Sequence, residues 1–290
     1  MQPSKFNLAI VTTQKSDFSL LLEQYSDGFY QYIHPKNAAD YDFALYTAIA
    51  VLGGAGDSPL VLDAAAREKL EARIGSGTKV FCEYMMSIGD IYTAEPVSTR
   101  FSRLVYCGPE EDSLKKGDLL EEQCNVFLPP YYSRSKETPW LIRCDSGADH
   151  SHAEVSDEMV LDLSNRALWL ENPNLMVCGF RMVNPVRARF SPFACWDTLF
   201  RKILEWLTGK KLDGFQLPRP YRGNQGRELS FNERAYKGVK SAINWFSEAK
   251  MLRGNGKKGI WEGFGTEVYP DGAQKMAPVK PPLPFWGIIS

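Results

Sequence analysis

The sequence predicts an α/β fold with a mainly parallel β-sheet, and the clearest support comes from one helix-to-strand unit. Residues Ala64–Ile74 are rich in strong helix formers, and Asp63 stands where an N-cap is expected. Gly75 and Gly77 supply a helix stop, and Lys79–Cys82 follows directly as a short apolar run. A helix that passes through a glycine-rich turn into a buried strand is half of a parallel crossover unit.

The segments before this unit extend the same pattern. Phe6–Thr13 is a near-continuous apolar run, as in a strand buried on both faces. Asp17–Ile33 carries apolar residues at helical spacing and predicts a helix. Asp42–Leu52 is a second apolar run, and Gly53–Asp57 then forms a backbone able to turn sharply.

From Phe101 onward the pattern changes to short apolar runs separated by Pro, Gly and charges, which predicts edge or antiparallel strands. Asn174–Met182 predicts one more buried strand, and Ala194–Leu207 predicts a helix with a broad apolar face. Phe231–Leu252 predicts a further helix, and Lys257–Ser290 is an irregular tail rich in aromatic residues.

These patterns divide the chain into three parts. Residues 1–208 form the predicted α/β domain, 209–229 have the Gly- and Pro-rich composition of a linker, and 230–290 form a helical and irregular C-terminal segment. The last segment is too short to bury its own aromatic side chains. We therefore expect it to pack on another surface, and a homo-oligomer formed through this tail is one way to do so.

Composition and charge exclude several classes of protein. The formal net charge is −1 for 290 residues, which gives no electrostatic case for binding nucleic acid or an anionic membrane. No apolar run approaches the roughly 20 residues of a membrane-spanning helix. The N-terminus lacks the long apolar region of a secretory signal, so a cytoplasmic location is expected.

The six cysteines form no CxxC pair, and most are expected to be small core residues. Cys82 is the alternative, because it ends a predicted parallel strand, where open α/β sheets place their sites. A reactive thiolate would need a neighbouring base, and Glu83 points to the other face of the strand. A thiol-dependent hydrolase using Cys82 stays one hypothesis, with Glu83 a further catalytic candidate.

Two of the three histidines, His150 and His152, lie on one short segment beside Asp149 and Glu154. Two histidines separated by one residue on an extended backbone place their imidazoles on the same side. The two carboxylates could then complete a site with oxygen and nitrogen ligands for a divalent metal. The alternative is a solvated polar loop, which its Asp, Ser and Gly content favours. Apart from this site, we expect no cofactor.

A third cluster mixes carboxylates with aromatic side chains. Glycoside hydrolysis uses a pair of carboxylates that lie about 5 to 9.5 Å apart across the bond. Glu262 and Glu267 are the candidates for such a pair. Aromatic rings can stack on sugars, and the candidates for substrate binding are Trp261, Phe264, Tyr269 and Asp271. A Gly-rich surface loop is the alternative interpretation.

Two stretches, AIAVLGGAGDSPLVLDAAAREKLEARIGSGTKVFCEY and RARFSPFACWDTLFRKILEWLTG, resemble class I glutamine-amidotransferase-like domains of the kind linked to glycoside hydrolases and trehalose-utilisation proteins. The resemblance implies a flavodoxin-like three-layer sandwich for the first ~208 residues. Residues 233–277 are similar to the opening of a helical glycosidase-type region, so 230–290 could be a truncated glycosidase domain.

The catalytic branch of that family has its nucleophile in a Gly-x-Cys-x-Gly elbow and a later His-x-Glu. Here the elbow region around Cys82 lacks the glycines, and Asn184–Arg187 has no histidine. We therefore expect no glutaminase activity. The leading hypothesis is a carbohydrate-active protein, either a glycoside hydrolase or a domain associated with one. The alternative from another class is a non-catalytic sugar-binding or oligomerisation module.

Overall fold

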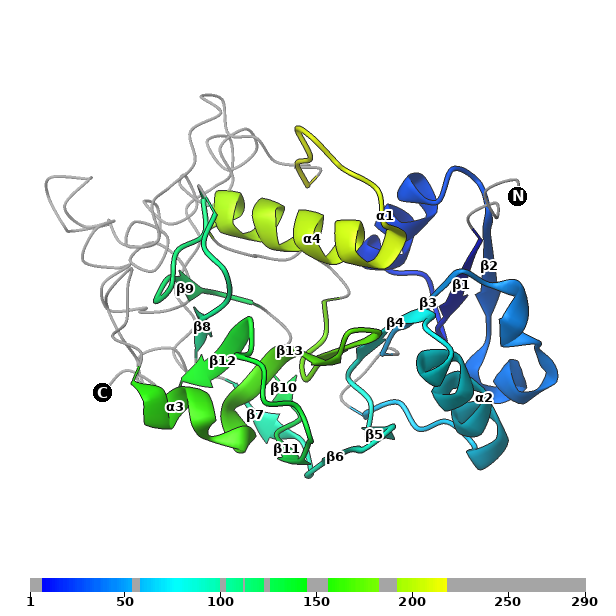
Figure 1. The fold of residues 1–290 in the computed structure, drawn as a ribbon, viewed down its shortest axis with the longest axis horizontal. Helices are drawn as coiled ribbons and strands as arrows, with labels where there is room; N and C mark the ends of the chain where they lie inside the picture. The colour runs from blue at the N-terminus through cyan, green and yellow to red at the C-terminus, as the bar shows by residue number, and fades with distance from the viewer. Residues whose placement is uncertain are drawn as a thin grey trace, which may run out of the picture. The chain divides into compact units, whose positions relative to one another are not determined.

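The computed structural model describes residues 7–53, 58–99, 103–111, 113–122, 126–144, 156–182 and 192–217. These residues form an α/β domain around a nine-stranded mixed sheet (Figure 1). In order across the sheet, its strands are β2 (Tyr30–Ile33), β1 (Leu8–Val11), β3 (Ala48–Val51), β4 (Lys79–Glu83), β14 (Leu175–Cys178), β13 (Arg166–Asn172), β12 (Leu141–Cys144), β8 (Arg103–Tyr106) and β9 (Leu119–Leu120).

The sheet has a parallel half and an antiparallel half. All pairings from β2 to β14 are parallel, as the crossover pattern predicted. All pairings from β14 to β9 are antiparallel, which confirms the change of pattern after Phe101. Because β14 pairs in parallel with β4 and antiparallel with β13, it is the strand at which the two halves meet.

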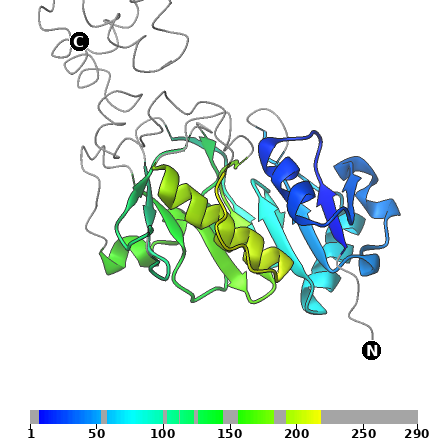
Figure 2. The same ribbon diagram turned by 90° about the horizontal axis from the view of Figure 1, so that it is seen from above.

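Helices cover both faces of the sheet, so the domain has three layers (Figure 2). One face carries α1 (Asp17–Tyr25) and α4 (Phe193–Thr208), which pack on a cluster that runs along both halves of the sheet. The other face carries α2 (Ala64–Gly75) with the short 3-10 helices η1 (Pro35–Asp40) and η2 (Phe43–Leu45). The predicted α/β class is therefore confirmed.

Two small sheets and a short helical pair complete the described domain. One small sheet joins β10 (Val126–Phe127) to β7 (Val97–Ser98), and the other has the order β11 (Pro130–Tyr132), β6 (Ile91–Thr93), β5 (Ser87–Ile88). The short helical pair is α3 (Asp157–Leu161) and the 3-10 helix η3 (Leu163–Asn165).

The predicted helix-to-strand unit is present. The Asp63 side chain accepts a hydrogen bond from the Ala66 backbone N–H at 2.7 Å, which caps the start of α2. The apolar edge of α2 is buried, including Leu70 and Ile74. After the helix, Gly77 adopts a φ of 95°, a left-handed conformation that glycine takes without a Cβ penalty.

The helix expected over Asp17–Ile33 is only partly correct. It ends at Tyr25, and Asp27 and Gly28 then adopt φ values of 55° and 77°. Two successive left-handed residues reverse the chain, and the following Tyr30–Ile33 becomes the edge strand β2. Aspartate and glycine are the residue types that tolerate this conformation, so the Asp-Gly pair was the missed signal.

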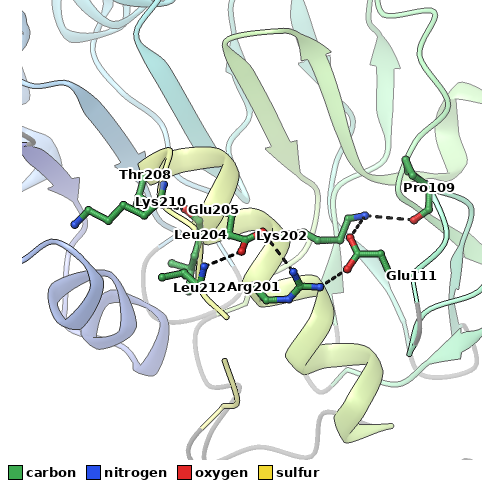
Figure 3. Close-up of polar contacts among 9 residues, drawn as sticks. All are labelled: Pro109, Glu111, Arg201, Lys202, Leu204, Glu205, Thr208, Lys210 and Leu212. Atoms are coloured by element: carbon green, nitrogen blue, oxygen red, sulfur yellow. Dashed lines mark hydrogen bonds and ion pairs between the residues drawn. The ribbon is translucent and has the colours of Figure 1, made fainter. Parts of the chain in front are cut away.

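Helix α4 is tied to the rest of the domain by an ionic cluster (Figure 3). Glu111, in the loop after β8, accepts from the Arg201 guanidinium and lies 2.8 Å from the Lys202 amine. Both cations of α4 are thus paired with the same carboxylate, and Arg201 also lies 3.5 Å from Glu205. Burial acts to raise the pKa of Glu111, but the Lys202 and Arg201 cations outweigh it and hold the pKa below its ordinary value.

The chain stays packed on the domain for nine residues after α4. Leu212 N–H donates to Glu205 at 2.8 Å, and Lys210 donates to the Tyr25 carbonyl oxygen at 3.0 Å. Phe215 and Leu217 are buried in the core cluster under α1 and α4. The described start of the expected linker, 209–217, is therefore part of the packed domain. The expected helix Phe231–Leu252 and the tail lie outside the described residues.

Candidate functional site

The carboxyl ends of β3, β4 and β14 lie side by side in the parallel half of the sheet. Val51 is opposite Cys82 in register, and Glu83 is opposite Cys178. Open α/β sheets place their sites at this edge, because loops leave it in several directions. The groups gathered here are therefore the candidate site.

Glu83 is the titratable group enclosed at this edge. Its side chain is fully buried, and Oε1 accepts a hydrogen bond from the Met182 backbone N–H at 2.8 Å. Within the described part of the chain, Oε2 makes no hydrogen bond. Burial raises the pKa of Glu83 to about 8, although the Met182 N–H and the Arg181 charge act in the opposite direction. Glu83 therefore holds its proton at neutral pH.

Tyr84 follows immediately and has a strained backbone. Its φ is 52°, in the left-handed region that a bulky side chain rarely adopts, and its ring is fully buried. The conformation is fixed by neighbours on both sides. The Tyr84 N–H donates to the Cys178 carbonyl oxygen at 2.8 Å, and its own carbonyl oxygen accepts from the Leu60 N–H at 2.9 Å. The Arg181 guanidinium carbon lies 5.8 Å from the ring centroid.

Gly53 is the residue that allows this packing. A Cβ built on Gly53 would lie 2.9 Å from the Tyr84 Cβ and 3.3 Å from the Glu83 carbonyl oxygen. Neither of these atoms can move without moving the backbone of β4. A glycine at the end of β3 is therefore required for close approach to the strained residue.

A strained residue directly after a buried strand is the geometry of a nucleophile elbow, which pushes one side chain out of the sheet. In this chain the strained residue is Tyr84, and the thiol of Cys82 lies two residues earlier, inside β4. Cys82 is fully buried in the cluster under α2, and that burial raises the pKa of its thiol far above its ordinary value. Burial of this kind disfavours the thiolate, which is the form in which a cysteine acts as a nucleophile.

The other described cysteines are also in the core. Cys107, Cys144, Cys178 and Cys195 are buried, as expected for cysteines in apolar runs. Cys178 donates to the Phe180 carbonyl oxygen at 3.1 Å, and its burial, together with the Glu83 charge, raises its pKa. Cys124 lies outside the described residues.

The remaining predicted site residues also lie outside the described residues. These are the metal candidates Asp149, His150, His152 and Glu154, and the carbohydrate candidates Trp261, Glu262, Phe264, Glu267, Tyr269 and Asp271. Within the ranges that the structure does describe, no three His, Cys, Asp or Glu side chains are arranged to hold a metal ion. The same ranges contain no helix with the length and apolarity that crossing a bilayer requires.

The structure brings together Glu83, Tyr84, Arg181 and Gly53, of which only Glu83 was a site candidate. Tyr84 and Arg181 were missed because neither belongs to a motif. The available signal was the sequence Cys82-Glu83-Tyr84 at the end of a predicted parallel strand, which marked the place without showing which residue takes the strained conformation.

Comparisons with known proteins give distant structural likenesses. No protein-family model and no curated protein sequence matches the chain. An α-L-fucosidase, isoenzyme 2 from Paenibacillus thiaminolyticus, aligns over 70% of this chain with 11% identity and a TM-score of 0.42, but the aligned part spans only 32% of the fucosidase. A ThuA-like protein from Bacteroides uniformis aligns over 74% of this chain and 96% of its own length, with 12% identity and a TM-score of 0.38.

PurLQS from Thermotoga maritima aligns over 61% of this chain and 86% of its own length, with 11% identity and a TM-score of 0.33. With TM-scores of 0.42 at most, these likenesses assign no activity to this chain. The chain itself is an α/β domain with a buried carboxyl group and a strained tyrosine at the carboxyl edge of its parallel strands.

Proposed function

We propose that this chain is a carbohydrate-active protein whose α/β domain performs no thiol chemistry. The proposal rests on which residue takes the strained position after β4. Tyr84 takes the strained position, with a φ of 52°, and the Cys82 thiol is enclosed in the core. An amidotransferase needs an accessible thiolate at this point. The domain resembles such enzymes in sequence pattern but lacks this requirement, so its role lies elsewhere.

In this proposal, hydrolysis is performed by carboxylates outside the described residues. Glu262 and Glu267 would be the catalytic pair, and the aromatic residues around them would bind the sugar. Glu83 would have a structural role, because its carboxyl group is fully buried and holds the turn after β14 through Met182. The partner is a carbohydrate, and no nucleic acid or membrane is involved. The cytoplasmic location and the homo-oligomer remain predictions.

Hydrolysis of a panel of aryl glycosides and polysaccharides by the full-length protein tests the proposal. We expect turnover that Glu262→Gln or Glu267→Gln reduces by a factor of about 10² to 10⁴, the usual contribution of a positioned acid or base. Glu68→Gln, an exposed residue of α2, is the matched control and should leave turnover unchanged. Turnover that survives in both Gln variants would remove these two residues from the mechanism.

The loss of the thiol site also favours a second candidate, a non-catalytic module that binds sugar or joins subunits through the C-terminal aromatic tail. It predicts binding without hydrolysis across the same panel, and a solution mass above that of one chain if the tail joins subunits. A third candidate is a hydrolase that depends on a metal at His150 and His152 or on the Cys82 thiol. Activity abolished by a chelator, or by Cys82→Ser, would establish it in place of the first.

A further inference from the structure

Three tyrosines form an exposed aromatic surface on the small sheet at the lower edge of the view in Figure 1. Tyr92 lies on β6, and Tyr131 and Tyr132 lie on β11. They are 41%, 64% and 43% exposed, respectively. Ile88 of β5 and Ile91 of β6 are buried in the core cluster under α2, which attaches this small sheet to the domain. The tyrosine rings therefore lie on the exposed side of a sheet whose two isoleucine side chains are packed in the core.

A β-bulge brings all three rings to the same place. Tyr132 is the register partner of Tyr92, and the register shifts between Pro130 and Tyr132. In a regular strand Tyr131 and Tyr132 would point to opposite faces, but a bulge re-aims a side chain. The Tyr131 ring is stacked on Tyr92 with a centroid distance of 6.2 Å and an interplanar angle of 29°. The Tyr132 ring lies 6.3 Å from Tyr92 at 60°.

A buried carboxylate fixes the chain immediately after the tyrosines. Glu171, 9% exposed, accepts from the Arg134 N–H at 2.7 Å and from the Ser135 N–H at 3.2 Å. It also accepts from the Ser133 hydroxyl and from the indole N–H of the fully buried Trp169. Three of these four donors belong to Ser133, Arg134 and Ser135, so the carboxylate ties this stretch of chain to β13. The aromatic surface is therefore pre-organised, which lowers the entropy lost when a ligand binds.

The two arginines beside the rings are each paired with a carboxylate. The Arg67 guanidinium carbon lies 5.5 Å from the Tyr92 centroid, and its Nε is paired with Glu71 at 2.6 Å. On the other side Arg134 donates to the Tyr132 hydroxyl at 3.4 Å and is paired with Asp90 at 3.3 Å. Each of these two arginines thus has its own carboxylate, and Glu171 adds one more negative charge. The surface offers aromatic faces and hydrogen-bonding groups without an excess of positive charge among these residues.

We propose that Tyr92, Tyr131 and Tyr132 form a binding site for a neutral oligosaccharide or polysaccharide chain. The C–H face of a sugar ring is apolar and can stack on a tyrosine ring, while the sugar hydroxyls around it hydrogen-bond to phenol, guanidinium and carboxylate groups. Tyrosine supplies this contact with little loss of side-chain freedom. The site lies on a different part of the domain from Glu83, and it stands whether or not the chain hydrolyses glycosides.

The size and charge of the surface favour this occupant over the two other classes that bind exposed tyrosines. Three tyrosine side chains of roughly 150 to 250 Å² each, about half exposed, offer roughly 300 Å². A stable protein partner covers about 800 Å² on each side. A single-stranded nucleic acid also stacks on aromatic rings but needs a positively charged groove for its phosphates. The paired arginines do not provide one.

The test is binding of the full-length protein to immobilised neutral polysaccharides, namely xylan, a β-glucan and a galactomannan, with heparin and single-stranded DNA alongside. We expect retention on at least one neutral polysaccharide. Tyr131→Ala and Tyr92→Ala should weaken it at least about tenfold, which corresponds to about 1.4 kcal/mol. Tyr131→Phe keeps the ring and should stay close to the parent protein. Tyr30→Ala, which removes a 37% exposed tyrosine from β2, is the matched control and should bind normally.

Retention on none of the neutral polysaccharides would overturn the proposal, as would retention that Tyr131→Ala and Tyr92→Ala leave unchanged. Retention on heparin or DNA alone would show that the surface serves a charged ligand and would overturn it as well. Circular dichroism of each variant confirms that the fold is intact, and the exposed Tyr131 is the safest position in this respect. Hydrolysis of aryl glycosides by the parent protein, together with polysaccharide retention that the Tyr variants leave unchanged, would refute this site while leaving the proposed function in place.

Discussion

Glu83 and Met182 are joined by a 2.8 Å hydrogen bond from a backbone N–H to a buried carboxyl oxygen, across the ends of β4 and the segment after β14. The contact satisfies one carboxyl oxygen in a place where water cannot reach. It also fixes the direction in which the chain leaves the strand that joins the two halves of the sheet.

The first prediction concerns the pH dependence of stability. The pKa of Glu83 rises from 4.5 to about 8 on folding because the side chain is buried. Between these values the folded state keeps a proton that the unfolded state loses, so raising the pH destabilises the fold. The free energy of unfolding from this group should fall by up to about 1.4 kcal/mol per pH unit over that window and level off above it.

Urea unfolding at pH 5 and pH 8 measures this effect. Glu83→Gln keeps the shape and cannot ionise, so it should remove most of the loss between the two pH values. Glu68→Gln on the exposed face of α2 should keep the parent dependence. Equal pH dependence in Glu83→Gln and the parent would show that Glu83 is already ionised in the folded state.

The second prediction tests the close approach of Gly53 to Tyr84. A methyl group on Gly53 would sit 2.9 Å from the Tyr84 Cβ, so Gly53→Ala should destabilise the fold by about 1 to 3 kcal/mol through overpacking. Gly75→Ala is the control, because a Cβ there meets no atom within 4 Å and improves helix propensity in the last turn of α2. The midpoint temperature of thermal unfolding should therefore fall for Gly53→Ala and rise for Gly75→Ala. A change in the same direction for both variants would refute the steric argument.

The third prediction is that Cys82 does not react in the folded protein. Its side chain is fully buried and burial raises the pKa of its thiol, so iodoacetamide at pH 8 should leave it unmodified until the chain is unfolded in urea. Peptide mapping by mass spectrometry identifies each cysteine separately, and the urea-unfolded sample is the control. Rapid alkylation of Cys82 in the native protein would favour the thiol-dependent hydrolase, the third candidate, over the carbohydrate-active protein.

The fourth prediction defines where the packed domain ends. Phe215 and Leu217 are buried in the core cluster, so Phe215→Ala and Leu217→Ala in the full chain should each cost about 2 to 4 kcal/mol of unfolding free energy. Phe29→Ala, at a position 37% exposed, should cost less than about 1 kcal/mol. If all three variants unfold at the temperature of the parent protein, the segment after α4 behaves as the linker that its composition suggested.

Local signals explain what the sequence could predict. Helix α2 and strand β4 were predictable because Asp63 caps the helix and Gly77 ends it, and both act within one turn. The predicted helix was wrong beyond Tyr25, because helical spacing of apolar residues continues past Asp27 and Gly28, two residues whose left-handed conformation reverses the backbone. The fold class survives such an error, since each strand and helix is specified mainly by its own residues.

The candidate site and the tyrosine surface depend on contacts between distant segments. Tyr84 takes its conformation from bonds to Cys178 and Leu60, which no pattern around residue 84 encodes. Tyr92 and Tyr132 are forty residues apart and meet only through the pairing of β6 with β11. Sequence reasoning could mark the end of β4 as a place for a site, but pairings of this kind decide which side chains occupy it.

The position of β14 has a consequence for the order of folding. Its pairing with β13 is a hairpin of neighbouring residues, which closes a short loop and should form early. Its pairing with β4 brings together Val80 and Leu175, about 95 residues apart, at a much larger loss of chain entropy. We expect the antiparallel half of the sheet to form first and the pairing of β14 with β4 to set the overall folding rate. Substitutions in β4 or β14 that weaken this pairing should therefore slow refolding more than they hasten unfolding.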